Sequence, residues 1–320
     1  MDALTALANG LNLRAKLAYA GGACGQWLMD HNSDRSIWFH LVGKGCGWAH
    51  SPALQAPLEI SEGDLVLFMP HAAKHFLSYS PEHLPADMSG TRITKWRDGD
   101  VGFVCGEIEL GIPQPPLWRA LPPEIIIRRS DAGDILARLI ELIVAESISS
   151  SFGYESVIER LCDSLFILVL RHCIETGQVR GGVFAAMQDK RLAAALEAIH
   201  LEPWKPWTIA ELCARAGLSR TVLAEKFAEH IGASPIEYLT SWRMQIASRW
   251  LMEPAMTIDR VAERCGYESA SAFSKAFKRS LGVSPVAYRR GLGEARHAEA
   301  GFPNGHLEPD GRAPGIRKDA

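Results

Sequence analysis

The chain has 320 residues, a length that predicts about two domains rather than a single core. It is 47% hydrophobic and 22% charged, which is close to the average globular protein and excludes a wholly disordered chain, a collagen and a coiled coil. The net charge of −3 is unevenly distributed. Residues 1–187 carry 15 basic and 21 acidic side chains, whereas residues 188–292 carry 15 basic and 11 acidic ones. We therefore expect only the C-terminal part to meet a polyanion.

Three further features predict a cytoplasmic protein with no membrane partner. The best apolar run, Leu165–Leu170, is far shorter than the roughly 18 residues of a membrane-spanning helix. The first residues include Asp2 and no early basic side chain, unlike a secretory signal peptide. The seven cysteines are scattered without a CxxC pair, which is typical of free thiols in a reducing compartment.

Residues 1–128 are predicted to form a small β-domain. Short β-rich runs separated by glycine and proline are typical of an antiparallel barrel or sandwich. The predicted strands are Ile37–Val42, Leu54–Ile60, Asp64–Met69, His75–Ser80 and Val101–Leu110. A proline-rich segment, residues 113–123, follows them.

A connector of two amphipathic helices is predicted over residues 129–187. The first helix begins near Asp131 or Asp134 and has one apolar face, formed by Ile135, Leu136, Leu139, Ile140 and Ile143. The second runs from Tyr154 to Thr176, ends at Gly177 and has an apolar face formed by Val157, Leu161, Leu165, Leu168 and Ile174. Because these faces are broad, we expect them to pack on each other and on a second subunit, as a homodimer.

Residues 188–292 are predicted to be helical and contain an internal repeat. Residues 208–217 (TIAELCARAG) match residues 257–266 (TIDRVAERCG) at an offset of 49. After one extra residue the offset is 50, and Phe227 and Tyr238 match Phe277 and Tyr288. Residues 293–320, rich in glycine, proline and charge, are predicted to be a disordered tail.

Each copy of the repeat has the pattern of a helix-turn-helix. Thr208 and Thr257 suit helix N-caps, and Gly217 and Gly266 suit the left-handed residue of a sharp turn. The second helix of each copy is predicted to bury one face and to expose the other to a DNA major groove. The residues predicted to be buried are Val222, Leu223 and Phe227 in the first copy and Ala272, Phe273 and Phe277 in the second.

A helix between the copies, Ile236–Met252, is predicted to separate the two second helices. At about 1.5 Å per residue it spans roughly 25 Å. That length could hold them near the ~34 Å spacing of successive major grooves, so that one chain reads two groove segments. The alternative is a helical solenoid, which needs three or more copies for stability.

Residues 188–292 resemble the DNA-binding domain of AraC/XylS-type transcriptional regulators. The resemblance is strongest at residues 258–269 (IDRVAERCGYES), 273–279 (FSKAFKR) and 282–290 (GVSPVAYRR). It implies that the base-reading positions are Arg220, Thr221, Ala224, Glu225, Ala270, Ser271, Ser274 and Lys275. The first copy departs from the family at Glu225, where a basic residue is common. A carboxylate accepts a hydrogen bond from a cytosine amino group but repels phosphate.

The N-terminal region resembles the cupin-type sensor domain of one subgroup of these regulators. The matching segments are residues 38–42 (WFHLV), 62–70 (EGDLVLFMP) and 103–108 (FVCGEI). Cupins often hold a metal through His and Glu, so His40, His71 and His75 are metal candidates beside their simpler role as structural histidines. The His-x-His pair of metal-binding cupins is missing, and we predict no cofactor.

Three cysteines are candidate sensor residues. Cys24 and Cys46 lie in glycine-rich segments that suit an accessible thiol, and Cys105 follows a β-rich run. A redox pair among the three is one interpretation, and inert thiols are the other. Some cupin-bearing members of the family look like oxidant sensors, so the resemblance permits the redox interpretation.

These patterns predict an α+β multidomain protein with a small cupin-like β-barrel, a two-helix connector and an all-α domain with two helix-turn-helix motifs. Its predicted function is sequence-specific regulation of transcription, not catalysis, in response to a small molecule or an oxidant. The predicted partners are double-stranded DNA, a second copy of the chain and an unknown small effector, and RNA polymerase is a further candidate. The alternative function is that of a cupin-type metal-dependent enzyme with a helical appendage.

Overall fold

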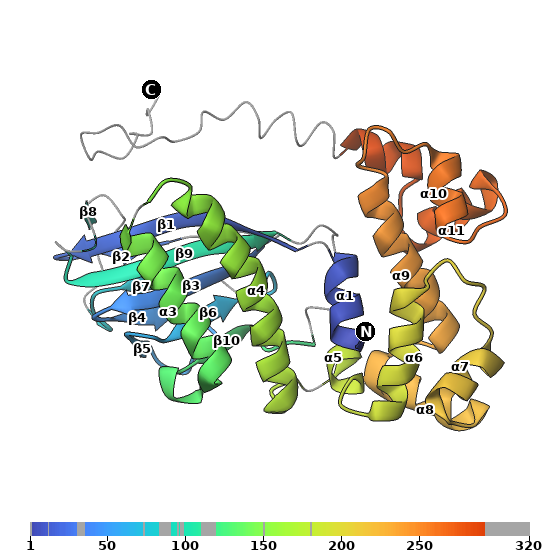
Figure 1. The fold of residues 1–320 in the computed structure, drawn as a ribbon, viewed down its shortest axis with the longest axis horizontal. Helices are drawn as coiled ribbons and strands as arrows, with labels where there is room; N and C mark the ends of the chain where they lie inside the picture. Colours follow the sequence, from blue (N-terminus) through green and yellow to red (C-terminus); the bar gives the residue numbers. More distant parts are fainter. Residues whose placement is uncertain are drawn as a thin grey trace.

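The protein has a sheet-rich N-terminal domain and a helical C-terminal domain, which confirms the predicted fold class (Figure 1). The structure is a computed structural model. It describes residues 2–11, 13–30, 36–72, 74–82, 91–94, 96, 99–109, 120–149, 151–179 and 181–291. The predicted tail and most of the proline-rich segment lie outside the described residues. None of the described helices is long and apolar enough to cross a membrane.

The N-terminal domain contains two antiparallel sheets. The six-stranded sheet has the order β10-β6-β3-β9-β1-β8, with β1 (Arg14–Cys24), β3 (Ser36–Lys44), β6 (Leu65–Phe68), β8 (Arg92–Thr94), β9 (Val101–Glu109) and β10 (Glu124–Ile127). The four-stranded sheet has the order β2-β7-β4-β5, with β2 (Leu28–Met29), β4 (Cys46–His50), β5 (Leu58–Ser61) and β7 (Phe76–Ser78). Side chains alternate across the first sheet: Phe103 and Cys105 of β9 join the core between the sheets, and Val104 and Ile108 face the helices.

Five of these strands correspond to predicted ones, and five do not. The predicted runs became β3, β5, β6, β7 and β9, although β5 begins only at Leu58. Strand β1 was not predicted because it contains four alanines and two glycines, which have low β-propensity. Its place in the sheet comes from pairing with β9 over most of its length.

Helices α3 (Gly133–Ser149) and α4 (Tyr154–Glu175) form an antiparallel pair that covers the outer face of the six-stranded sheet (Figure 1). Two residues of their predicted apolar faces remain exposed in the single chain. Ile135 is 66% exposed and Val157 is 43% exposed. The buried arc of α3 runs through Leu136, Ile140 and Ile143, and Ile135 lies one residue, about 100°, outside it.

The C-terminal domain consists of short helices arranged around one long one. They are α5 (Gly182–Ala186), α6 (Lys190–Leu201), α7 (Ile209–Ala216), α8 (Arg220–Ile231), α9 (Pro235–Trp250), α10 (Ile258–Arg264) and α11 (Ala270–Leu281), followed by a helical segment at residues 285–291. Helix α9 is the predicted connecting helix and lies between the two helix-turn-helix units, α7–α8 and α10–α11.

Helix α1 (Ala3–Leu11) precedes the first strand but packs on the C-terminal domain. Its contacts are with α6 and α9, where Leu7 and Leu11 are buried. Arg249 of α9 donates from Nη1 to the carbonyl oxygens of Asn9 (3.3 Å) and Gly10 (3.4 Å). A Cβ atom on Gly10 would lie 2.2 Å from the Trp242 ring, so glycine is what permits the close approach of the two helices.

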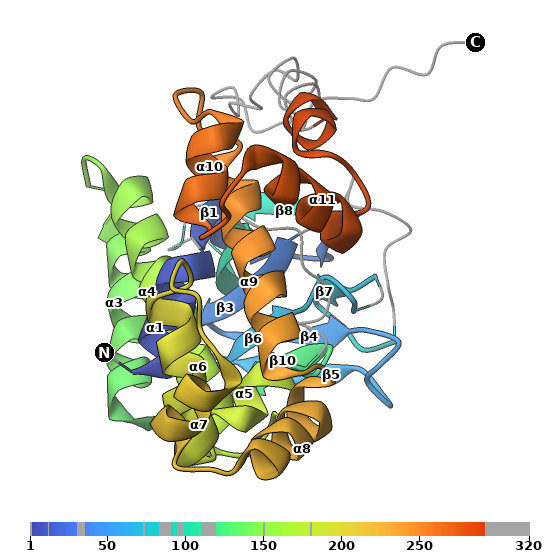
Figure 2. The ribbon, with the colours of Figure 1, turned by 90° about the vertical axis from the view of Figure 1, so that its right-hand side faces the viewer.

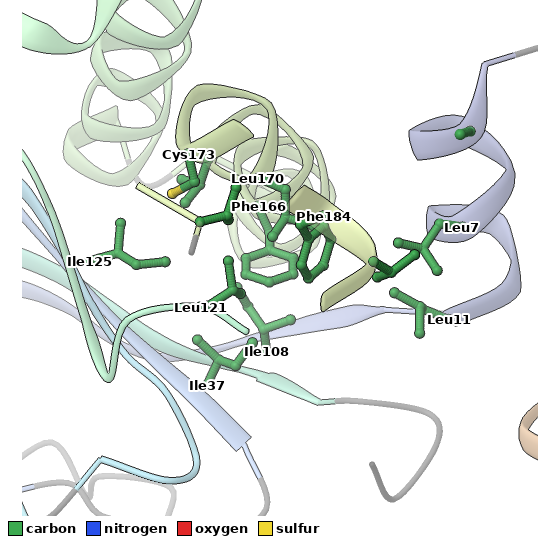
Figure 3. Close-up of a cluster of buried hydrophobic side chains, with 14 of the residues drawn as sticks. Leu7, Leu11, Ile37, Ile108, Leu121, Ile125, Phe166, Leu170, Cys173 and Phe184 are labelled. Carbon is green, nitrogen blue, oxygen red and sulfur yellow. The ribbon is translucent and has the colours of Figure 1, made fainter. Parts of the chain in front are cut away.

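One hydrophobic core therefore extends through both domains. In Figure 3, Ile37 and Ile108 of the sheet lie beneath Phe166 and Leu170 of α4, and Ile125 lies to one side of them. Phe184 of α5 lies between this group and the side chains of Leu7 and Leu11 of α1. The same cluster continues through Leu196 and Trp207 to Leu223 and Phe227 of the first helix-turn-helix unit. The second unit has a separate core that includes Val261, Phe273 and Phe277.

We expect Gly10→Ala to release α1 from the C-terminal domain. Alanine normally stabilises a helix interior by about 0.5–1 kcal/mol relative to glycine, but here the added methyl group meets the Trp242 ring. Hydrogen exchange of the residue 3–11 amides should become at least about tenfold faster. The matched control is Asn9→Ala, an exposed position on the same turn, which should leave the exchange rate unchanged or slower. Equal rates in Gly10→Ala and the wild type would contradict the docking.

Candidate nucleic-acid interface

The first helix-turn-helix unit is built from local capping interactions. The Thr208 hydroxyl accepts from the Glu211 amide (3.2 Å), and the Glu211 carboxylate accepts from the Thr208 amide (2.9 Å), which makes a capping box. The turn is made by Gly217 at φ 62°, a left-handed conformation that favours glycine. Ser219 then caps α8 by accepting from the Val222 amide. The predicted cap and turn are confirmed.

The second unit repeats this construction. The Thr257 hydroxyl accepts from the Arg260 amide (3.2 Å), Gly266 has φ 73°, and Ser269 caps α11 by accepting from the Ala272 amide. Local chemistry thus positions α8 and α11 in equivalent ways within the two units.

One face of each of α8 and α11 is buried, and the opposite face is exposed. Leu223 and Phe227 of α8 and Phe273 and Phe277 of α11 are fully buried. The prediction that Val222 and Ala272 are buried was wrong. Val222 is 37% exposed and Ala272 is exposed as well, because each lies about 100° from the buried residue that follows it.

The residues predicted to read bases lie on these two helices. Arg220, Thr221, Ala224, Glu225, Ser271 and Lys275 are exposed, and Ala270 and Ser274 are half-buried. Figures 1 and 2 place α8 and α11 towards opposite ends of α9, on the side of the molecule away from the two sheets.

The two exposed helix faces differ in charge. Directly opposite the buried residues, α11 presents Ser271, Lys275 and Lys278, whereas α8 presents Thr221, Glu225 and Ala228 at the equivalent positions. The nearby Lys226 is held by Asp189 in an ion pair of 2.7 Å, an interaction that lowers the pKa of the Asp189 carboxyl. The second unit therefore presents positive charge, and the first presents a carboxylate.

The interior of the N-terminal domain contains two of the three candidate histidines. His40 and His75 are buried with their Nε2 atoms 3.2 Å apart, and the His75 ring stacks on Phe68 at 3.8 Å. His71 is exposed and does not join them. Among the described residues, no three His, Cys, Asp or Glu side chains gather as a metal-binding group.

The three candidate sensor cysteines are free thiols in different surroundings. Cys105 is buried, and burial raises the pKa of its thiol. It lies opposite Tyr19 in the sheet, whereas Cys24 lies opposite Arg92. The five positions between Tyr19 and Cys24 span about 16 Å at ~3.3 Å per residue, far beyond disulfide reach. The strand register therefore separates Cys24 from Cys105.

The residues next to Cys24 and those next to Cys46, by contrast, both contact Asp100. The Asp100 side chain accepts from the Gly25 amide (3.2 Å), and its backbone amide donates to the Ala23 carbonyl (3.0 Å). On the other side, a Cβ atom on Gly45 would lie 2.5 Å from the Asp100 carbonyl oxygen. Cys24 is half-buried and Cys46 is exposed, at the same end of the domain.

Comparison with known proteins accounts for both domains. A family model described as cupin matches residues 2–175, and one described as helix-turn-helix domain matches residues 212–291. A putative AraC-like transcription regulator of Streptomyces lividans is 30% identical over 301 residues, which cover 91% of this chain and 98% of that protein. The chain belongs to the AraC-like transcription regulators.

A second relative agrees with this assignment. An HTH-type transcriptional regulator of Haemophilus influenzae is 30% identical over 91% of this chain and 99% of its own. Among solved structures, the DNA-binding domain of AdpA in complex with a target DNA is 33% identical and covers 34% of this chain and 94% of that chain, with a TM-score of 0.30. This AraC-like regulator is thus a sequence-specific DNA-binding protein, as the repeat predicted.

The structure adds one residue on the exposed face of α11 that the sequence did not single out. Lys278 lies one turn beyond Lys275 on the same exposed line of α11. The family resemblance names only positions in the first turns of the helix. At 3.6 residues per turn, however, Lys278 could have been predicted to lie on the same face as Lys275.

Proposed function

We propose that this AraC-like regulator binds its operator with α8 and α11 as a homodimer, and that the state of its cupin domain controls this binding. The observation that carries the proposal is the shared core, in which α1 and α4 join the sheet to the first helix-turn-helix unit. A change in the cupin domain that shifts α1 or α4 must alter packing around the helices that hold α8.

In this proposal the two units divide the work of DNA recognition. Lys275 and Lys278 supply cationic contacts to phosphate or guanine, and Ser271 and Ser274 lie beside them for base edges. The first unit contributes Arg220 and Thr221, and Glu225 accepts from a cytosine amino group. The eight predicted reading residues and Lys278 form the proposed interface.

The homodimer is proposed to form through α3 and α4. An apolar stripe that contains both exposed and half-buried residues runs along the pair, made of Ile135, Leu139, Leu142, Val157, Leu161 and Leu168. Phe152, at the turn between the helices, is fully exposed. A contiguous apolar surface of this kind marks an interaction site, and these helices form the outer layer of the domain (Figure 1).

The proposed input is oxidation of Cys24 and Cys46 to a disulfide. The two thiols lose two protons and two electrons to an oxidant such as hypochlorous acid or hydrogen peroxide, which is reduced to chloride and water or to water. Supporting this pair, residues next to each cysteine contact Asp100, and Cys24 ends strand β1, whose other end leads to α1. Because β9 lies between β1 and β3, forming the bond must draw the ends of these two strands together, which moves β1. His40 and His75 pack with Phe68 as core side chains, and the cupin domain acts as a sensor, not as an enzyme.

We expect Lys275→Ala in the full chain to weaken operator binding about tenfold. The loss of one phosphate contact should also lower the slope of log K against log salt by about 0.9. Gel-shift titrations at several salt concentrations measure both quantities. Lys190→Ala, an exposed lysine at the start of α6, is the matched control. Ser271→Ala should change base preference in a selection from random duplexes, and unchanged binding in both α11 variants would refute the interface.

We expect Leu139→Glu with Leu168→Glu to convert a dimer into monomers, because a charge within an apolar interface loses its hydration. Sedimentation at micromolar concentration measures the oligomeric state. Since Leu139 and Leu168 also touch the core, a second variant, Ile135→Glu with Leu142→Glu, changes more exposed side chains and should give the same result. Glu141→Lys, an exposed position on the flank of α3 away from this stripe, should remain dimeric. A monomeric wild-type protein would end this proposal.

We expect oxidant-dependent reporter output to disappear in Cys24→Ser and in Cys46→Ser, and to persist in Cys105→Ser. Mass spectrometry of the non-reduced, oxidant-treated protein should detect a peptide pair joined through Cys24 and Cys46. The raised pKa of the buried Cys105 thiol keeps it protonated and unreactive at neutral pH. If Cys24→Ser and Cys46→Ser both respond as the wild type does, the input is a small ligand rather than an oxidant.

A further inference from the structure

The loop that precedes α7 is held by an arginine of the shared helix α9. Arg243 donates from Nε to the Pro203 carbonyl oxygen (2.5 Å) and from Nη2 to the Lys205 carbonyl oxygen (2.8 Å). The guanidinium is half-buried, so these carbonyls replace water as its partners. The loop of the first unit is thereby fixed to α9.

The same loop touches the turn of the second unit. A Cβ atom on Gly266 would lie 2.3 Å from the Trp204 carbonyl oxygen and 3.4 Å from Nη2 of Arg243. The Arg243 guanidinium also lies over the Tyr267 ring, 6.0 Å from its centroid. Residues 203–205, Arg243 and the Gly266–Tyr267 turn thus pack together as one contact, which we call the inter-unit clasp.

This clasp matters because the two units have separate cores. The first unit belongs to the core that it shares with the cupin domain, and the second packs around Val261, Phe273 and Phe277. A single helix sets the distance along its own axis, but the rotation of each unit about that axis depends on side contacts. The clasp joins a loop of one unit directly to the turn of the other.

An arginine in the second unit makes similar contacts with a loop, but that loop belongs to its own unit. Arg289 donates from Nε to the Leu251 carbonyl oxygen (2.9 Å) and from Nη2 to the Met256 carbonyl oxygen (2.6 Å). Both residues that accept these bonds precede α10 of the same unit. Arg289 therefore holds one unit together, whereas Arg243 reaches between two.

We propose that Arg243 is a positioning residue that, with residues 203–205 and Gly266, fixes the angle between α8 and α11 and so sets the half-site spacing that one chain reads. The inference rests on the proposed function, in which both helices contact DNA. It does not place Arg243 on the DNA.

The test compares the full-length wild type, Arg243→Gln and Arg289→Gln on a duplex selected from a random library by the wild-type protein. A second duplex carries two extra base pairs between the half-sites, which rotate one half-site by about 70°. Two more duplexes each keep one half-site and scramble the other. Fluorescence anisotropy measures all affinities.

For the wild type, the insertion should cost at least about tenfold in affinity. Arg243→Gln should bind the uninterrupted duplex about tenfold more weakly, lose less than about threefold on insertion, and keep wild-type affinity for each single half-site. Arg289→Gln should weaken the second half-site itself and retain the insertion penalty. Gly266→Ala, which forces a Cβ atom against the Trp204 carbonyl at a left-handed φ, should behave as Arg243→Gln does.

Two results would overturn the inference. A full insertion penalty in Arg243→Gln and Gly266→Ala would mean that α9 alone sets the spacing. A reduced affinity of Arg243→Gln for the first half-site alone would mean that Arg243 only stabilises its own unit. Failure of the proposed function looks different, because then Lys275→Ala would bind the selected duplex as tightly as the wild type.

Discussion

The architecture of this regulator depends on the burial of α1 against α6 and α9. The chain begins with a helix that is tethered to the first strand of one domain and packed on the helices of the other. Leu7 and Leu11 are removed from water there, and each fully buried leucine contributes roughly 1.5–3 kcal/mol relative to exposure. Because the Trp242 ring lies against Gly10, a larger side chain at that position disrupts the contact. The two domains are thus joined by packing as well as by the chain.

The boundary between the two hydrophobic cores of the helical domain does not coincide with the boundary between the chain's two domains: it separates the two helix-turn-helix units from each other. The two helix-turn-helix units repeat one construction, but the first is continuous with the cupin domain and the second has a core of its own. Packed side chains of the shared core therefore connect the cupin domain to α8, and α9 with the contacts of Arg243 connects that core to the second unit. The exposed faces of α8 and α11, which belong to different cores, also differ in charge.

The core of the cupin domain contains aromatic side chains that pack against one another. Phe68, His40 and His75 pack ring against ring, and Trp27 meets Phe103 edge to face. The half-buried thiol of Cys24 and the exposed thiol of Cys46 lie at one end of the domain, where the glycines next to them contact Asp100. Strand β1 runs from α1 to that end, so one strand links Cys24 to the helix that packs on the DNA-binding domain.

The sequence by itself determined the local structures, because their causes are local. Thr208, Thr257, Gly217 and Gly266 specify caps and turns through bonds and backbone angles within a few residues, and the structure has them where the repeat predicted them. Only the tertiary structure decided which residues far apart in the chain meet. The burial of α1, the separation of Cys24 from Cys105 by strand register, and the crossing of Arg243 to the second unit depend on partners 22 to 240 positions away in the chain. Hydrophobic periodicity shows that a face must be buried, but it carries no information about which surface covers it.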